Sequence, residues 1–349
     1  MAAQANLVGG RRFFRKRDNV GAAILSETIH DHSDVFAPLR TQIVTVDGHT
    51  YRELRSDLEA RWPRVWAELA ATIVTVAVLP VASARIERRL GRWGVLVAPI
   101  AAAAVGTTVH RLGHFLHEGA HFNVAPDKAI NDRVTNATVG VVVLTDVRAY
   151  RPIHMVHHRK LGQVDDPERG YFERFNGRFV FRGISGARVM FSMRQRLAAA
   201  ETEGSRPSKL VPLAGAALHA GVVIGLLRAG RRGSAAAWAI GIGGVYPLLN
   251  STRQLLEHRD ESDDLDETPA DAPARALTRM FTKGPLSPII GGVGFNRHLL
   301  HHWDASVSYT RLRELEQRLQ STDAGPILVA RQGSYSETLR RMWQSGRRR

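Results

Sequence analysis

The chain has 349 residues, 44% of them hydrophobic, no cysteine and a formal net charge of +15. This length suffices for one large domain or two ordinary ones. The absence of cysteine excludes disulfides, zinc–thiolate sites, iron–sulfur clusters and haem–thiolate chemistry within the chain. A transition metal would therefore be held by histidine, carboxylate, amide or water.

The basic charge narrows the classes of partner to nucleic acid, anionic lipid or an acidic protein. No nucleic-acid motif stands out in the sequence, and many arginines flank apolar runs. This placement favours a membrane surface over nucleic acid. The alternative is a soluble basic domain.

Residues 1–64 are polar and basic, with a charged aromatic cluster at residues 11–17. No apolar core follows this cluster closely, so it lacks the pattern of a cleaved secretory signal. We expect a basic N-terminal arm on the membrane surface or in solvent. Residues 41–46 predict a short strand, and Asp47-Gly48 predicts a turn after it.

Four apolar runs follow, each of roughly 16 to 18 residues, which is at the lower edge of what spans a bilayer. They cover residues 69–84, 93–109, 210–227 and 234–249. Buried helices of a soluble protein are the alternative. Arginine-rich segments bracket the runs, as at residues 85–89 and 228–232, and favour membrane helices.

Three histidine-rich segments lie beside these runs. His110, His114, His117 and His121 are spaced by four, three and four residues, which places them on one face of a helix. Residues 154–158 and 298–302 share the spacing H-x-x-H-H. Neutral imidazole is a good ligand for iron and zinc, so we expect the three boxes to converge on a metal centre.

The order of runs and boxes is consistent with this convergence, because two helical hairpins would leave all three boxes on one side of a membrane. Residues 134–144 must then form a segment that does not span, and eleven residues are too few to cross. The arginine-rich loops at 85–92 and 228–232 would lie opposite the boxes. Short basic loops prefer the cytoplasm, which conflicts with a cytoplasmic site. The N-terminal arm and the box-bearing segments are also basic, so the charge rule does not decide the orientation.

Three further segments carry weaker signals. Phenylalanines alternate with arginines over residues 172–200, which suits an interfacial amphipathic element. Residues 259–274 are acidic and contain proline, which predicts a mobile loop. The basic end of the chain, from residue 322 on, is expected to lie on the membrane.

Nine histidines have settings typical of metal ligands: His117, His121, His154, His157, His158, His258, His298, His301 and His302. Nine imidazoles exceed one tetrahedral zinc site and suit two metals. In H-x-x-H-H the outer pair is i, i+4, while the middle histidine is rotated and can reach a second metal. For His258 an ordinary surface histidine is the alternative. We interpret His110, His114 and His219 as structural or outer contacts.

The boxes HEGAH, HMVHH and NRHLLHH resemble those of the membrane fatty acid desaturase family. Residues 162–167 (GQVDDP) are similar to that family's acidic-proline segment. Residues 305–309 and Leu312 resemble the segment that usually follows the third box in that family. Arg253 with Glu257-His258 looks like its extra histidine motif. The resemblance covers about residues 93–320.

The resemblance implies an all-α fold: an integral membrane four-helix stem with a cytosolic histidine-rich cap that holds two irons. The nine histidines would be the iron ligands. In some members an amide side chain four residues before the extra histidine contributes through water, and Gln254 stands at that offset. Such enzymes use oxygen and two electrons to remove hydrogen from an unactivated C–H bond.

We therefore expect a basic arm over residues 1–64, a membrane di-iron domain over 65–320 and a basic tail over 321–349. The expected activity is that of a fatty acid desaturase acting on an acyl lipid or acyl thioester. A hydroxylase or ketolase with the same centre is the alternative. Asp165, Asp166 and Glu118 could orient ligating rings. Electrons would come from a separate ferredoxin-like or b-type cytochrome donor, drawn to a basic face.

A rival from another class rests on His117-Glu118-Gly-Ala-His121, which reads H-E-x-x-H, the zinc metalloprotease motif. Its position near an apolar run would suggest a membrane protease. That reading leaves both H-x-x-H-H boxes without a purpose. Metal content discriminates between the two readings: the di-iron oxidase would hold two irons per chain, and the protease would hold one zinc.

Overall fold

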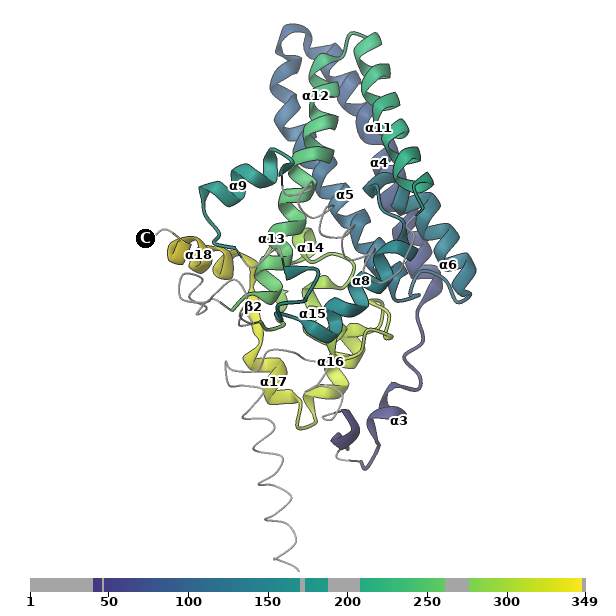
Figure 1. Cartoon of the computed structure of the whole chain (residues 1–349), viewed down its shortest axis with the longest axis vertical. Helices are drawn as coiled ribbons and strands as arrows, with labels where there is room; N and C mark the ends of the chain where they lie inside the picture. The colour runs from purple at the N-terminus through teal and green to yellow at the C-terminus, as the bar shows by residue number, and fades with distance from the viewer. Residues whose placement is uncertain (1–39, 46, 170–172, 188–207, 261–275, 347–349) are drawn as a thin grey trace, which may run out of the picture.

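The computed structural model describes residues 40–45, 47–169, 173–187, 208–260 and 276–346. These residues are mostly helical, as expected, and their two named strands form a small parallel sheet. Long helices run side by side at one end of the molecule, and shorter helices gather at the other end (Figure 1).

Helix α4 (Trp62–Leu90) and helix α5 (Ala98–Ala120) form a hairpin joined by the 3-10 turn η1 (Gly91–Val97). Gly91 has a φ of 57°, a left-handed conformation that glycine adopts at little cost, and it ends α4. Both helices begin with proline in the first turn, where its missing N–H leaves no bond unmade. The predicted run 69–84 lies inside α4, which extends beyond it at both ends, whereas the run 93–109 begins in η1 and ends within α5.

The second pair is helix α11 (Leu210–Arg228) and helix α12 (Arg232–Ile240). A π-helical turn, η4 (Gly241–Val245), continues α12 into helix α13 (Tyr246–His258). Glu87 of α4 caps the start of α12, because its carboxylate accepts the Gly233 N–H at 3.1 Å and the Ser234 N–H at 2.8 Å. The two arginine-rich loops thus meet at the far end of the long helices.

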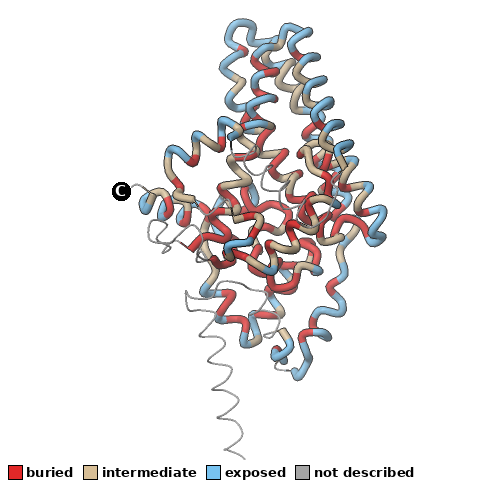
Figure 2. The backbone as a smooth tube through the Cα atoms, viewed as in Figure 1, coloured by how far each residue is buried: buried red, intermediate tan, exposed pale blue. Residues whose placement is uncertain are grey.

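Two helical stretches of the described chain, Trp62–Ala120 and Leu210–Arg228, are long and apolar enough to cross a membrane. Only 22% and 11% of their apolar windows are buried, whereas the core helix of a soluble protein is mostly buried. Figure 2 shows exposed residues along the long helices and buried residues gathered below them. Ile100 and Leu210 are 72% and 77% exposed. Exposed apolar surface of this extent indicates contact with something other than water.

Close glycine contacts set the packing of α5 on η4. A Cβ on Gly106 would lie 2.4 Å from the Val245 side chain, and one on Gly241 would lie 2.6 Å from Val105. Each glycine therefore receives the valine of the facing element, and the two backbones approach closely. This contact fixes the register of α5, which carries the first box, against the element that leads to His258.

The other end of the molecule is built from short elements. Before the second apolar pair these are α3 (Tyr51–Arg55), α6 (Lys128–Thr135), η2 (Asn136–Gly140), α7 (Val141–Val143), α8 (Val147–Lys160) and α9 (Gly177–Ile184). After it come β1 (Met280–Lys283), α14 (Ser287–Ile290), η5 (Phe295–Arg297), α15 (His298–Trp303), α16 (Leu312–Gln320), α17 (Gly325–Ala330), β2 (Gln332–Ser334) and α18 (Tyr335–Gly346).

The structure corrects one local prediction and agrees with two others. The strand expected over residues 41–46 is wrong: residues 40–42 are helical and Val44 forms only one isolated bridge, to Thr50. The turn at Asp47-Gly48 is confirmed by the Gly48 N–H bond to Thr45 and a φ of 85°. Residues 134–144 form η2, α7 and their flanks, which do not make a span.

Some expectations lie outside the described residues. They concern the arm over residues 1–39, Phe172 and Phe191, and nearly all of the acidic segment 259–274. Within the phenylalanine-rich stretch, α9 is amphipathic, because Phe179 is buried and Phe181 is exposed. Its predicted interfacial position stays a prediction.

Candidate metal centre

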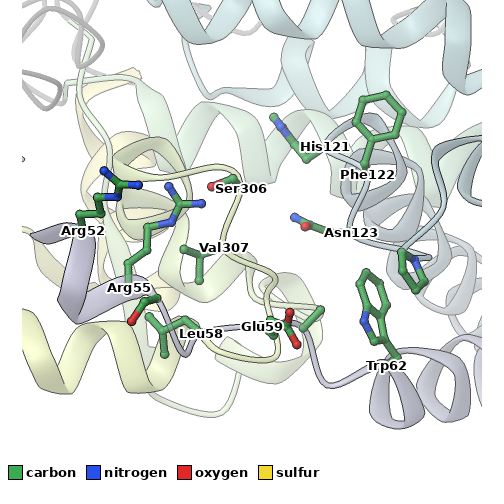
Figure 3. Close-up of a pocket in the computed structure, with 13 residues that line it drawn as sticks. Arg52, Arg55, Leu58, Glu59, Trp62, His121, Phe122, Asn123, Ser306 and Val307 are labelled. Carbon is green, nitrogen blue, oxygen red and sulfur yellow. The ribbon is translucent and has the colours of Figure 1, made fainter.

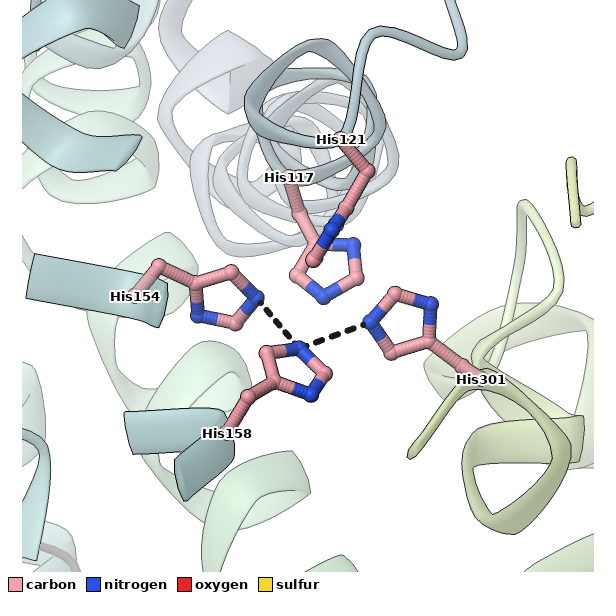
Figure 4. A group of neighbouring side chains, drawn as sticks. All are labelled: His117, His121, His154, His158 and His301. Atoms are coloured by element: carbon pink, nitrogen blue, oxygen red, sulfur yellow. Dashed lines mark hydrogen bonds between the residues drawn. The ribbon is translucent and has the colours of Figure 1, made fainter. Parts of the chain in front are cut away.

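Five imidazoles from all three boxes form one cluster, which we call cluster one. Its members are His117, His121, His154, His158 and His301. Each contributes one ring nitrogen, and these five nitrogens all lie within 4.8 Å of one another. Figure 4 shows His117 and His121 projecting from the end of α5 toward rings from α8 and α15. Segments far apart in the sequence therefore point nitrogen atoms at one small volume.

Cluster two lies directly beside the first and consists of two overlapping groups. One group is His157, His258 and His302, and the other is Glu257, His258 and His298. The ring centroids of His158 and His302 are 4.2 Å apart, so the two clusters adjoin. All nine histidines singled out from the sequence are thus brought together.

The middle histidine of each H-x-x-H-H box belongs to a different cluster from its outer neighbours. In the second box His154 and His158 join cluster one while His157 joins cluster two. In the third box His298 and His302 join cluster two while His301 joins cluster one. The rotation of one position along a helix produces this division, as the spacing predicts.

The contacts between rings fit a bound cation. The Nε2 atoms of His158 and His154 are 3.0 Å apart, and those of His301 and His158 are 3.1 Å apart. Among the described residues, neither ring nitrogen of the buried His117 has a hydrogen-bond partner. Converging nitrogens with few protons to share could hold a metal ion, and an imidazole set suits iron, zinc, copper or nickel.

The electrostatics keep these rings neutral. Burial, reinforced by neighbouring histidines, holds the pKa of His158, His301 and His302 well below its usual value. A neutral ring leaves a lone pair on one nitrogen for a metal. The clusters are therefore ready for a metal at neutral pH without first releasing protons.

Buried carboxylates orient several of the rings. Asp166 contacts the His157 Nδ1 at 3.1 Å, which leaves Nε2 to face cluster two. Glu118 lies 3.6 Å from the His117 Nδ1 and also accepts the Tyr309 N–H at 3.3 Å. Asp165 differs from expectation, because its exposed side chain pairs with Lys160 instead.

Two residues that orient a ring of the second box were not among the sequence predictions. The Tyr150 hydroxyl lies 3.2 Å from the His154 Nδ1, and a carboxylate oxygen of Glu168 lies 3.6 Å from the same atom. Tyr150 stands four residues before His154, so helical spacing could have identified it. Glu168 comes directly after the acidic-proline segment.

A second network supports cluster two from outside the boxes. The Tyr335 hydroxyl donates to Glu257 at 2.8 Å, and Arg253 forms an ion pair with the other oxygen of Glu257. Glu257 is fully buried, and these two partners satisfy both of its carboxylate oxygens. The same carboxylate lies 3.8 Å from the His298 Nε2. The chain after residue 320 therefore contributes to the site through Tyr335.

Helix ends are tied together where the first two boxes meet. Arg151 of α8 donates to the carbonyls of Ala120 and Gly119 at 2.8 and 3.0 Å, and pairs with Asp132. Those carbonyls lie in the last turn of α5, and that of Gly119 also accepts the Phe122 N–H at 3.2 Å and an Asn131 side-chain N–H at 2.8 Å. The first box is thus held in register with the second by an arginine three residues before His154.

The third box is anchored by the segment before α4. The Tyr51 hydroxyl donates to Asp304 at 3.0 Å, and Arg55 lies 3.4 Å from the same carboxylate. Tyr51 also packs edge-on against Trp303, with ring centroids 6.4 Å apart. Residues near the N-terminus therefore fix the short helix α15, every residue of which is buried.

A pocket of about 540 Å³ opens beside cluster one (Figure 3). His121 forms part of its wall, together with Phe122 and Asn123 after the first box and Val307 after the third. Arg52, Arg55 and Trp62 line the outer side. The pocket connects the surface of the molecule with a histidine of the cluster.

The remaining histidines of the apolar helices make structural contacts. His219 lies 2.9 Å from the Val142 carbonyl and accepts the Trp238 indole N–H at 3.2 Å. His110 lies 3.1 Å from the Ile290 carbonyl, and His114 stacks on Phe295. Gln254 is half-buried, and its part in a metal shell stays a prediction.

Comparison with known proteins agrees with this geometry. The sequence model described as Fatty acid desaturase matches residues 91–330, a range that contains the three boxes and His258. No single curated protein matches the chain. Because the match covers more than half of the chain, the protein belongs to the fatty acid desaturase family.

Proposed function

We propose that this protein is an oxygen-dependent, non-haem di-iron oxidase that desaturates the acyl chain of a lipid. The observation that carries the proposal is the convergence of nine histidines into two adjoining clusters. His117, His121, His154, His158 and His301 would hold one iron, and His157, His258, His298 and His302 the other. Two irons, when bound, would supply the redox chemistry that lets oxygen attack an unactivated C–H bond.

The protein's own contribution is to position the rings and balance their charge. Asp166 and Glu168 fix the rings of His157 and His154, and Glu257 lies beside His298. Such outer contacts set the ring orientation and strengthen the ligands. They also bring negative charge close to cations that imidazole alone does not neutralise.

We propose that α4, α5, α11 and the continuous α12–η4–α13 segment form a four-helix membrane stem. The apolar composition and low burial of Trp62–Ala120 and Leu210–Arg228 support this arrangement. The clusters would then lie at one membrane surface, on the cytoplasmic side where a reductant is available. The arginine-rich loops would lie at the opposite surface.

The pocket supports a class of substrate, and the net charge supports a class of electron donor. An acyl lipid or acyl thioester would reach cluster one through the pocket beside His121, whose outer side carries Arg52 and Arg55. Electrons would come from a separate acidic ferredoxin-like or b-type cytochrome protein. The net charge of +15 supports attraction of such a donor.

Hydroxylation or ketolation of a hydrophobic substrate at the same centre is the second candidate function. The zinc protease alternative is weaker, because its motif uses only His117 and His121 of the five imidazoles in cluster one. Its general base would be Glu118, but one oxygen of that side chain accepts the Tyr309 N–H. The motif alone therefore leaves most of the site unexplained.

The reaction can be identified from the lipids of cells that express the protein. We expect mass spectrometry to detect acyl chains that have lost two hydrogens, because desaturation removes one from each of two carbons. Chains that have gained one oxygen would identify a hydroxylase instead. An unchanged lipid profile in cells that also express a competent electron donor would contradict the proposal.

Each cluster can be tested with one substitution. His301→Ala removes a ligand from cluster one and His157→Ala removes one from cluster two, so each should abolish turnover. Iron per chain should fall from about two to about one, because a site that loses a ligand holds its metal less tightly. Elemental analysis of the purified variants measures this.

The control is His219→Ala, which removes only contacts to Val142 and Trp238 and should leave the iron content unchanged. Full activity and full iron content in both cluster variants would refute the metal roles.

Access through the pocket can be tested without altering a ligand. Ala60→Trp would fill the pocket, and we expect turnover to fall on the order of tenfold or more, because a substrate displaced by even a small distance reacts poorly. Iron content should stay the same. Ala60→Ser is the matched control, since it adds little volume. Normal turnover in Ala60→Trp would show that substrate enters elsewhere.

A further inference from the structure

A groove of about 620 Å³ lies between α4 and α11, at the end of the long helices that is away from the histidine clusters. Its apolar walls come from Pro80, Val81 and Ala84 on one side and Val222 and Leu226 on the other. Gly221 and Gly225 form its floor, and a Cβ on either would meet nothing within 4 Å. The groove is therefore open space bounded by hydrocarbon.

Three arginines close one end of this groove: Arg85, Arg88 and Arg231. Among the described residues, none of the three forms an ion pair with a carboxylate. The neighbouring Glu87 directs both of its oxygens to Gly233 and Ser234 at the start of α12. The Glu87 carboxylate also attracts Arg231 electrostatically, so one negative charge stands against three guanidinium groups and the mouth of the groove keeps a net positive charge.

This combination matches the chemistry of one kind of ligand. An apolar groove that ends in several arginines fits an acyl chain joined to a phosphate, because guanidinium binds phosphate oxygens in pairs. A zwitterionic head group would bring a further cation to a place where positive charge already exceeds negative charge. A head group with net negative charge suits the site better.

We propose that this groove binds one anionic phospholipid, with its phosphate on the three arginines and an acyl chain along Gly221 and Gly225. The inference rests on the proposed membrane stem, but it does not depend on the proposed reaction. The lipid belongs to the leaflet opposite the histidine clusters, so it is a structural ligand and not the substrate. It would neutralise arginines that the charge rule does not favour at that surface.

The test is native mass spectrometry of the purified full chain, titrated with phosphatidylglycerol or with phosphatidylcholine. We expect one tightly bound phosphatidylglycerol and at least roughly tenfold weaker binding of phosphatidylcholine, since charges near a membrane surface each strengthen attraction to anionic lipid. The triple variant R85Q/R88Q/R231Q should lose this preference. The triple variant R89Q/R92Q/R232Q is the matched control, because it removes equal charge from the same loops outside the groove.

A second pair of variants tests the acyl chain without changing charge. Gly225→Leu would fill the groove and should weaken phosphatidylglycerol binding about tenfold or more, while Ala217→Leu on an exposed position of the same helix should not. The proposal would be overturned if R85Q/R88Q/R231Q or Gly225→Leu bound phosphatidylglycerol as well as the unaltered protein does. Equal binding of both lipids to the unaltered protein would also overturn it. Because the readout is lipid binding, a protein with no desaturase activity would still give a clear result.

Discussion

Nitrogen lone pairs that face one another in a buried site repel unless a proton or a metal cation lies between them. The histidine clusters are governed by this constraint, because their ring nitrogens approach to 3.0–3.1 Å in several pairs. Burial keeps His158, His301 and His302 neutral, so protons are too few to join all the rings. A pair of metal ions would satisfy the constraint, and the folded chain brings the histidines that could hold them from α5, α8, α13 and α15.

The contacts around the clusters explain why these short helices are held so firmly. Arg151 bonds the end of α5 to α8, and Tyr51 bonds the start of the described chain to Asp304 beside the third box. Tyr335 reaches Glu257 from the last helix. The first box, the third box and the segment that carries His258 are therefore each held by a residue from another element, which suits a site that needs accurately placed nitrogen atoms.

The sequence predicted the site better than its surroundings, for physical reasons. Helical spacing alone divides His154 and His158 from His157, and the structure has the same division. The strand expected over residues 41–46 failed because a β-branched run gives only a weak preference when no neighbouring strand pairs with it.

Contacts between distant residues had no local signal. Tyr335 lies 78 residues from Glu257, and no spacing rule connects them. Tyr150 was accessible from its i, i+4 relation to His154, but a tyrosine on a helix is more often a packing residue. Helix α4 begins before its apolar run, in a turn whose Val65 packs into the core, and it continues after the run until Gly91 ends it.

The central claim is that two imidazole-rich sites hold iron side by side. Its most direct test is the metal content of the purified, unaltered chain together with X-ray absorption at the iron edge. We predict about two irons per chain with nitrogen neighbours and the scattering pattern of imidazole rings. About one zinc per chain, with four ligands and no iron, would contradict the account.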